Sequence, residues 1–196
     1  SKNGEVRTLQ KATIGDGIDI ILLGDAYSDR QIADGTYHDD MNKMCEHFFS
    51  EEPFKSFRDY FNVYYVNIVS CTEGYDNPGA ALMGYYDGAW SAVETVCFNY
   101  AQRVVGEDRM NECTIIIGLN SDIYTGVCYF YRPDYNSDYG SGITIALFSN
   151  GGEEETAKQL LHHEACGHGF AKLSDEYVVL EQSIPGDNVY YHQQDQ

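Results

Sequence analysis

The sequence predicts a single α/β domain in which helices are layered on a sheet, because two kinds of apolar segment alternate along the chain. Short β-branched runs between glycines or polar residues are typical of buried strands, and they occupy residues 18–23, 63–69, 114–119 and 143–148. Longer stretches with apolar residues at helical spacing occupy residues 31–49 and 90–105. Alternating strands and helices predict an α/β architecture. We therefore expect one domain over residues 1–196, with no linker or repeat dividing it.

A third helix is predicted after Gly151-Gly152. Glu153, Glu154 and Glu155 would lie in its first turn, where negative charge suits the helix dipole, and the helix would continue to His168. The Gly- and Tyr-rich segments 74–90 and 124–142 are predicted to be loops, where binding surfaces usually lie.

Composition excludes several classes of partner. The chain has 12 basic and 31 acidic residues and a formal charge of -19, so it repels phosphate backbones; we expect no nucleic acid and no anionic membrane surface as partner. No apolar run approaches the roughly 18 to 20 residues that span a bilayer. Six scattered cysteines without a C-x-x-C pair leave two interpretations open, disulfides in an oxidised compartment or unpaired buried thiols.

Three of the six histidines fall within residues 162–168. Hydrolysis at zinc needs three protein ligands, an open position for water and a carboxylate that accepts a proton. The usual H-E-x-x-H pattern puts two histidines on one helix face, but His163 and His168 are five positions apart, about 140° on an ideal helix. They can share a metal only if the turn widens, as in a π-bulge, and Gly167 would ease such a distortion. We therefore predict a widened or broken turn between Ala165 and His168.

Other groupings within this cluster remain open. His162 with Cys166, and Glu164 with His168, have the ideal four-residue spacing, and a thiolate ligand would suit a closed structural zinc site. Alternatively, Cys166 is a small buried residue, and His162 forms hydrogen bonds or packs against a neighbour. The whole cluster has one further interpretation, a helix whose three histidines are all satisfied without a metal.

The run E-A-C-G-H-G-F-A-K-L-S-D-E-Y, from Glu164 to Tyr177, resembles the signature of the bacterial IgA-peptidase family of zinc metallopeptidases, approximately H-E-F-G-H-S-F-x-x-L-x-D-E-Y. One extra residue separates the two histidines, and the resulting H-E-x-x-G-H is similar to the expanded motif of the dipeptidyl-peptidase III family. Weaker similarities, including I-D-I-I-L-L-G-D-A-Y-S-D near the start, extend the resemblance over about residues 16–177.

The resemblance implies a zincin-like mixed sheet with an active-site helix, that is, a metzincin-like layered catalytic domain. It makes His163 and His168 zinc ligands and Glu164 the catalytic base. Asp175 is the expected third ligand, Glu176 is its substitute, and either one has the alternative role of orienting a histidine. Because family members continue further beyond the Asp-Glu-Tyr run, we expect the C-terminal part of the domain to be missing.

The predicted function is therefore a zinc-dependent endopeptidase that cleaves extracellular or host proteins and is secreted or held in the cell envelope. The substrate would lie extended along an edge strand, for which residues 143–148 are the candidate. The alternative is a catalytically weak, metal-stabilised surface module that binds glycans or glycoproteins through residues 124–142. The spacing Asp134-x-Asn136-x-Asp138 is similar to the start of a calcium loop, but Tyr139 and Ile145 replace the required Gly and Glu, so we interpret this segment as a solvated loop.

Overall fold

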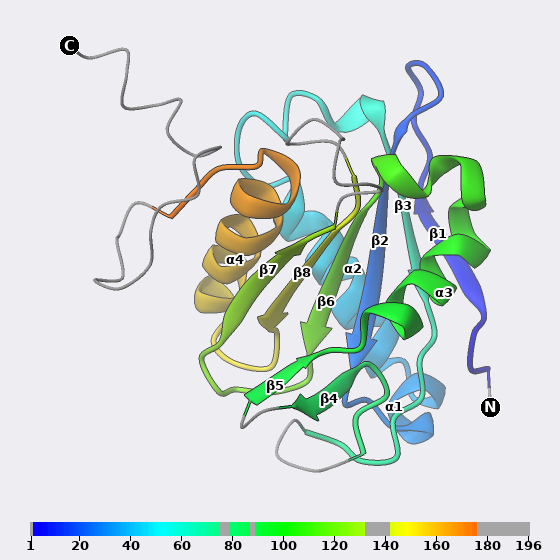
Figure 1. Cartoon of the computed structure of the whole chain (residues 1–196), viewed down its shortest axis with the longest axis vertical. Coiled ribbons are helices and arrows are strands. Elements are labelled where there is room, and N and C mark those ends of the chain that lie inside the picture. Colours follow the sequence, from blue (N-terminus) through cyan, green and yellow to red (C-terminus); the bar gives the residue numbers. More distant parts are fainter. Residues whose placement is uncertain (1, 75–78, 87–88, 132–141, 176–196) are drawn as a thin grey trace.

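The fold is built on a six-stranded mixed sheet. The computed structural model describes residues 2–74, 79–86, 89–131 and 142–175 (Figure 1). Its strands are β1 (Val6–Gln10), β2 (Ile18–Asp25), β3 (Phe61–Val66), β4 (Met83–Tyr86), β5 (Ala89–Ala92), β6 (Thr114–Leu119), β7 (Gly126–Phe130) and β8 (Thr144–Ser149). The main sheet has the order β1-β3-β2-β6-β8-β7, and β4 and β5 form a second, two-stranded sheet. The predicted α/β class and mixed sheet are confirmed.

Strand direction divides the main sheet into a parallel centre and two antiparallel edges. Strands β3, β2, β6 and β8 are parallel to one another, whereas β1 and β7 run antiparallel to their neighbours. The central strands β2, β6 and β8 are almost entirely buried, which explains their continuous apolar runs, since a parallel sheet is covered on both faces.

The expectation that residues 143–148 form an edge strand is wrong. They belong to β8, which lies between β6 and β7, so the edge on this side is β7. Strand β7 comes from the segment 124–142 that was predicted to be a loop. Its residues are half-buried or exposed, as expected for an edge strand, and its short, Gly-containing sequence carries little strand signal.

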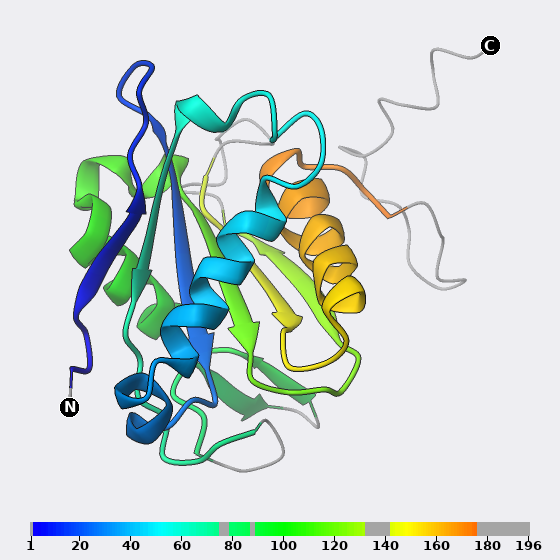
Figure 2. The same cartoon turned by 180° about the vertical axis from the view of Figure 1, so that it is seen from behind.

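Helices cover both faces of the sheet. In Figure 1 helix α3 (Glu94–Val105) lies in front of it, and Figure 2 shows α2 (Thr36–Phe48) and α4 (Glu154–Leu161) on the opposite face. Two 3-10 helices, Arg58–Tyr60 and Glu107–Glu112, complete the described elements together with α1 (Asp29–Ala33) and a π-helix over His162–Phe170.

Two of the predicted helices differ from those observed. The single helix expected over residues 31–49 is interrupted between α1 and α2 by Gly35, whose φ of 96° lies in the left-handed region that favours glycine. The helix expected to begin at residue 90 begins at Glu94, because the preceding residues form β5.

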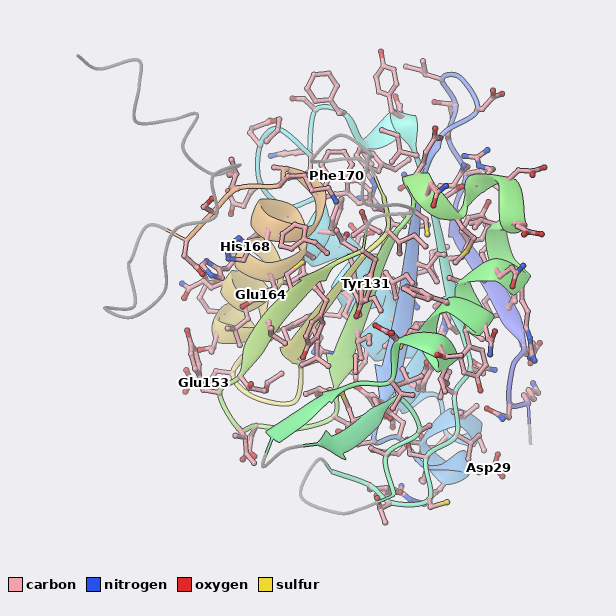
Figure 3. All side chains as sticks on the ribbon, viewed as in Figure 1. Asp29, Tyr131, Glu153, Glu164, His168 and Phe170 are labelled. Atoms are coloured by element: carbon pink, nitrogen blue, oxygen red, sulfur yellow. The ribbon has the colours of Figure 1, made fainter. Side chains whose placement is uncertain are left out.

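The core consists of two layers that alternate along the central strands. On β2, Ile20 and Leu22 pack against α2 and α4, whereas Ile21 and Leu23 face α3, as the two-residue period of a strand requires. Leu160 and Leu161 anchor the end of α4 in the first layer. Figure 3 shows Glu153 near the start of this helix and His168 beyond its other end, so packing against the sheet sets the position of the histidine cluster.

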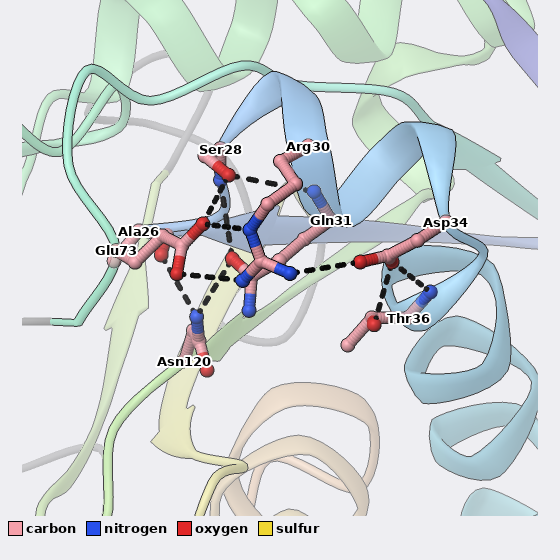
Figure 4. A network of polar contacts seen from close by, with 8 residues as sticks. All are labelled: Ala26, Ser28, Arg30, Gln31, Asp34, Thr36, Glu73 and Asn120. Atoms are coloured by element: carbon pink, nitrogen blue, oxygen red, sulfur yellow. Dashed lines mark hydrogen bonds and ion pairs between the residues drawn. The ribbon is translucent and has the colours of Figure 1, made fainter.

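A polar network joins α1 to the segment after β3 (Figure 4). Arg30 forms two bonds to Glu73, Nε to Oε1 at 3.1 Å and an Nη to Oε2 at 2.9 Å, and Ser28 donates its hydroxyl to the same carboxylate. The other Nη of Arg30 bonds Asp34 at 3.0 Å, and Asp34 in turn accepts from the backbone N–H of Thr36 at 3.0 Å. These contacts connect α1 to the start of α2 and hold the segment around Glu73 beside α1.

Membrane spans and cysteine pairing were the other features considered from the whole sequence. In the ranges that the structure describes, no helix is long and apolar enough to cross a membrane. All six cysteines are unpaired; Cys71 is exposed and Cys128 is half-buried, and the other four are buried. Four of the six cysteines therefore have the buried position that the thiol interpretation expects.

Candidate metal centre

The predicted widened turn is present. Helix α4 passes directly into the π-helix His162–Phe170, and the backbone N–H of Ala171 bonds the carbonyl of Cys166, five residues earlier, at 3.0 Å. The i to i+5 repeat is the one that brings residues five apart onto one face. As a result the rings of His163 and His168 lie side by side, with centroids 4.5 Å apart.

Asp175 joins the two histidines. The Nε2 atoms of His163 and His168 are 3.1 Å apart, and Asp175 Oδ1 lies 3.1 Å from His168 Nε2 and 3.3 Å from His163 Nε2. Ligands of one tetrahedral ion with bonds of about 2.0 Å are separated by roughly 3.3 Å. The three donor atoms therefore fit a zinc ion without rearrangement, although ligation itself stays a prediction.

The hydrogen bonding of His168 favours the same use of its ring. Its Nδ1 lies 2.7 Å from the carbonyl oxygen of Leu173, and a carbonyl only accepts, so the proton must be on Nδ1. In the neutral ring this tautomer puts the lone pair on Nε2, which lies 3.1 Å from both His163 Nε2 and Asp175 Oδ1. A histidine that donates from one nitrogen to a carbonyl and directs the other at its fellow donor groups has the usual arrangement of a metal ligand.

Glu164 lies on the inner side of this cluster. It is buried, with 6% of its surface exposed, and its side chain packs against Gly126 on the edge strand β7. Burial raises the pKa of Glu164, and His163 and His168 act in the opposite direction. Among the described residues, no donor forms a hydrogen bond to its carboxylate. The group is therefore free to accept a proton from a molecule at the cluster.

His162 and Cys166 do not belong to the cluster. The Nε2 of His162 lies 2.8 Å from the carbonyl of His47 and 3.2 Å from the hydroxyl of Ser50, which ties the π-helix to the end of α2. Cys166 is buried in the core layer beneath α4. These contacts confirm the interpretation of His162 as a hydrogen-bonded neighbour and of Cys166 as a small buried residue.

A comparison with known protein families identifies the family of this chain. Residues 7–187 match the family described as IgA Peptidase M64. The chain belongs to that family. A search among curated proteins found no match. Membership confirms the resemblance seen from Glu164 to Tyr177 and makes the domain a peptidase, with a protein or peptide as its substrate. M64 peptidases generally depend on a metal.

Sequence reasoning missed three features of the M64 site. The left-handed backbone of Lys172, with φ of 56°, turns the chain so that Leu173 N bonds Gly167 O at 3.0 Å and Leu173 O reaches His168. The Nζ of Lys172 caps the π-helix at Gly169 O, at 2.8 Å. A backbone carbonyl that accepts a hydrogen bond from a histidine, as Leu173 O does from His168, leaves no signal in the sequence. The third feature, Gly126, does leave one, because glycine within a strand often marks the close approach of another group.

The glycine expected to ease the widened turn is not the one that the M64 π-helix requires. Gly167 has no left-handed φ, and a Cβ there would lie 3.5 Å from His162 O, an ordinary contact. A Cβ on Gly169 would lie only 3.2 Å from Glu164 O. The close packing of the turn therefore favours glycine at 169 more strongly than at 167.

Several predicted residues lie outside the described part of the chain. These are Glu176, the substitute third ligand, Tyr177, and the Asp134-x-Asn136-x-Asp138 segment.

Proposed function

We propose that this M64 domain is a zinc-dependent endopeptidase in which His163, His168 and Asp175 hold the metal and Glu164 is the general base. The observation that carries the proposal is the meeting of three donor atoms, 3.1 to 3.3 Å apart, next to a buried carboxylate that bonds no donor in the described ranges. A site that only stabilised the fold would not need a free carboxylate beside its ligands.

The reaction follows from the placement of these groups. When bound, zinc supplies Lewis acidity toward water and toward the scissile carbonyl. Glu164 accepts the proton from the attacking water and then delivers it to the leaving nitrogen. Its position on the inner side of His163 and His168 keeps the proton transfer within the cluster, and its burial against β7 limits competition from bulk water.

The side of β7 that faces away from β8 is our proposed binding site for the substrate chain. Thr125 O accepts from Ser149 N, and Tyr131 N donates to Ile143 O, so residues 125, 127, 129 and 131 direct their backbone groups toward β8. The alternate residues Gly126 and Cys128 therefore direct theirs away from β8. An extended peptide would add to this edge as a further strand and pass beside Glu164. We therefore propose β7, and not residues 143–148, as the strand that binds the substrate.

We propose that the sheet and the π-helix form a zincin-like, metzincin-like catalytic layer, and that the protein is secreted or held in the cell envelope and acts on extracellular or host proteins. The alternative binding module relied on residues 124–142. Part of this segment is the edge strand β7, and residues 132–141 lie outside the described ranges.

The test is the Glu164→Gln variant of the zinc-loaded protein, assayed on fluorescently labelled casein. We expect proteolysis to fall by the 10²- to 10⁴-fold typical of losing a general base, while zinc content is retained. Glu155→Gln is the matched control, since Glu155 is exposed on α4, where its side chain contacts Lys158 and Gln159. Anomalous scattering at the zinc edge should place the metal among His163, His168 and Asp175. Unchanged proteolysis by Glu164→Gln with zinc bound would refute the mechanism.

A further inference from the structure

Gly126 occupies the point at which the edge strand meets Glu164. A Cβ atom on Gly126 would lie 2.6 Å from Oε1, 2.9 Å from Cγ and 3.1 Å from Cδ of Glu164. All three of these nearest atoms belong to the one side chain that we propose as the general base. No alanine or larger residue fits at 126 while Glu164 stays where it is.

Backbone conformation does not explain this glycine. Gly126 pairs with Phe148 in the regular antiparallel register of β7 and β8, and its φ is not in the left-handed region. Glycine within a strand weakens it, because it adds conformational freedom and packs no side chain. The conformation suits any residue, so the requirement for glycine comes from the space that Glu164 occupies.

The wall formed by β7 also matters for the placement of Glu164. In the described ranges no hydrogen bond holds its carboxylate, so packing against β7 has a large share in defining where the carboxylate lies relative to His163 and His168. We propose that Gly126 is a positioning residue, whose bare backbone lets the Glu164 carboxylate lie beside the metal ligands. This inference rests on the proposed role of Glu164, and it adds a determinant from the edge strand that is distant in sequence from the H-E-x-x-G-H run.

The expected displacement is large on the scale of catalysis. With alanine at 126, Oε1 must move from 2.6 Å to an ordinary contact of at least 3.4 Å. Because the carboxylate is the flexible end of its side chain, the fold can absorb this movement, and the base is what moves. A misplacement of about 1 Å can cost roughly 10²-fold in rate.

The experiment uses Gly126→Ala in the zinc-loaded protein. We expect kcat to fall about 10²-fold while KM changes little and zinc content stays at the wild-type level. A crystal structure of the variant should show the Glu164 carboxylate displaced and His163, His168 and Asp175 in place. Gly152→Ala is the matched control, because a Cβ there meets nothing closer than 3.8 Å; its kcat should equal that of the wild type.

A second pair of variants covers the case in which Gly126→Ala folds poorly. Combined with Glu164→Ala, which removes the atoms nearest to the new Cβ, the substitution at 126 should no longer lower the melting temperature. An equal drop in both backgrounds, or an unmoved Glu164 carboxylate in the Gly126→Ala crystal structure, overturns the inference. If the wild-type protein cleaves no peptide, the proposed function fails, and the crystal structure and the melting temperatures still decide whether residue 126 sets the position of Glu164.

Discussion

Two glycines in the π-helix should respond in opposite ways to substitution by alanine. Gly169 is buried, and a Cβ on it would lie 3.2 Å from Glu164 O and 3.5 Å from both Thr114 Cγ2 and Thr144 Oγ1. Its carbonyl is also fixed by Thr144 Oγ1 at 3.0 Å, so the backbone cannot easily move away. Among the described residues, the nearest atom to a Cβ on Gly167 is His162 O, at 3.5 Å. The two substitutions therefore add the same atom to one helix in very different surroundings.

The magnitudes follow from these contacts. Forcing an extra methyl group into a close-packed site costs about 1–3 kcal/mol, so Gly169→Ala should lower the melting temperature by about 2–12 °C in a domain of this size. Gly167→Ala should be neutral or stabilise by up to about 1 kcal/mol, because alanine restricts the unfolded chain.

Differential scanning calorimetry with zinc and with a chelator is the appropriate assay. The loss in Gly169→Ala should persist in chelator, because the crowding involves the backbone and not the metal. Equal melting temperatures for the two variants would refute the argument that close packing at 169, and not flexibility at 167, accompanies the widened turn.

Two other predictions concern the ligands and their support. Asp175→Ala removes one of the three proposed donors, which lies at an exposed position. It should weaken zinc binding by more than the 10- to 100-fold that is typical of losing a residue that only orients a ligand, and it should leave the far-UV circular dichroism unchanged. A zinc affinity equal to that of the wild type, measured by competition with a chelator, would exclude Asp175 as a ligand. Lys172→Val places a β-branched residue at φ of 56° and should destabilise the folded protein by about 1–3 kcal/mol, whereas Lys172→Gly keeps the turn. The two variants should therefore differ in melting temperature. Similar melting temperatures would show that the left-handed turn is not required.

Local patterns in the sequence were enough to predict much of the fold. The runs at residues 18–23 and 114–119 correspond to β2 and β6, because strands buried on both faces carry an apolar signal that does not depend on their neighbours. The widened turn was predictable for a similar reason. Two metal-binding histidines that are five positions apart, as His163 and His168 are, conflict with the geometry of an α-helix, and this conflict is visible in the sequence itself.

The errors occur where the outcome depended on neighbouring segments. Strand β7 is short, half-buried and contains glycine, so only its pairing with β8 makes it a strand. The break at Gly35 depended on a left-handed φ, which glycine allows but does not impose. The order of the strands, which made β7 the edge instead of β8, is a property of the whole sheet.

The family and the candidate metal donors can be read from the amino-acid sequence, because the motif from His163 to Asp175 is contiguous and its chemistry belongs to the residue types. The folded chain is needed to show which atoms meet: Leu173 O at His168, His162 at the end of α2, and Gly126 against Glu164. The last two contacts join segments far apart in the chain, and the first depends on a backbone turn. Side-chain identity alone does not specify such distances, because they are set by how the helix packs on the sheet.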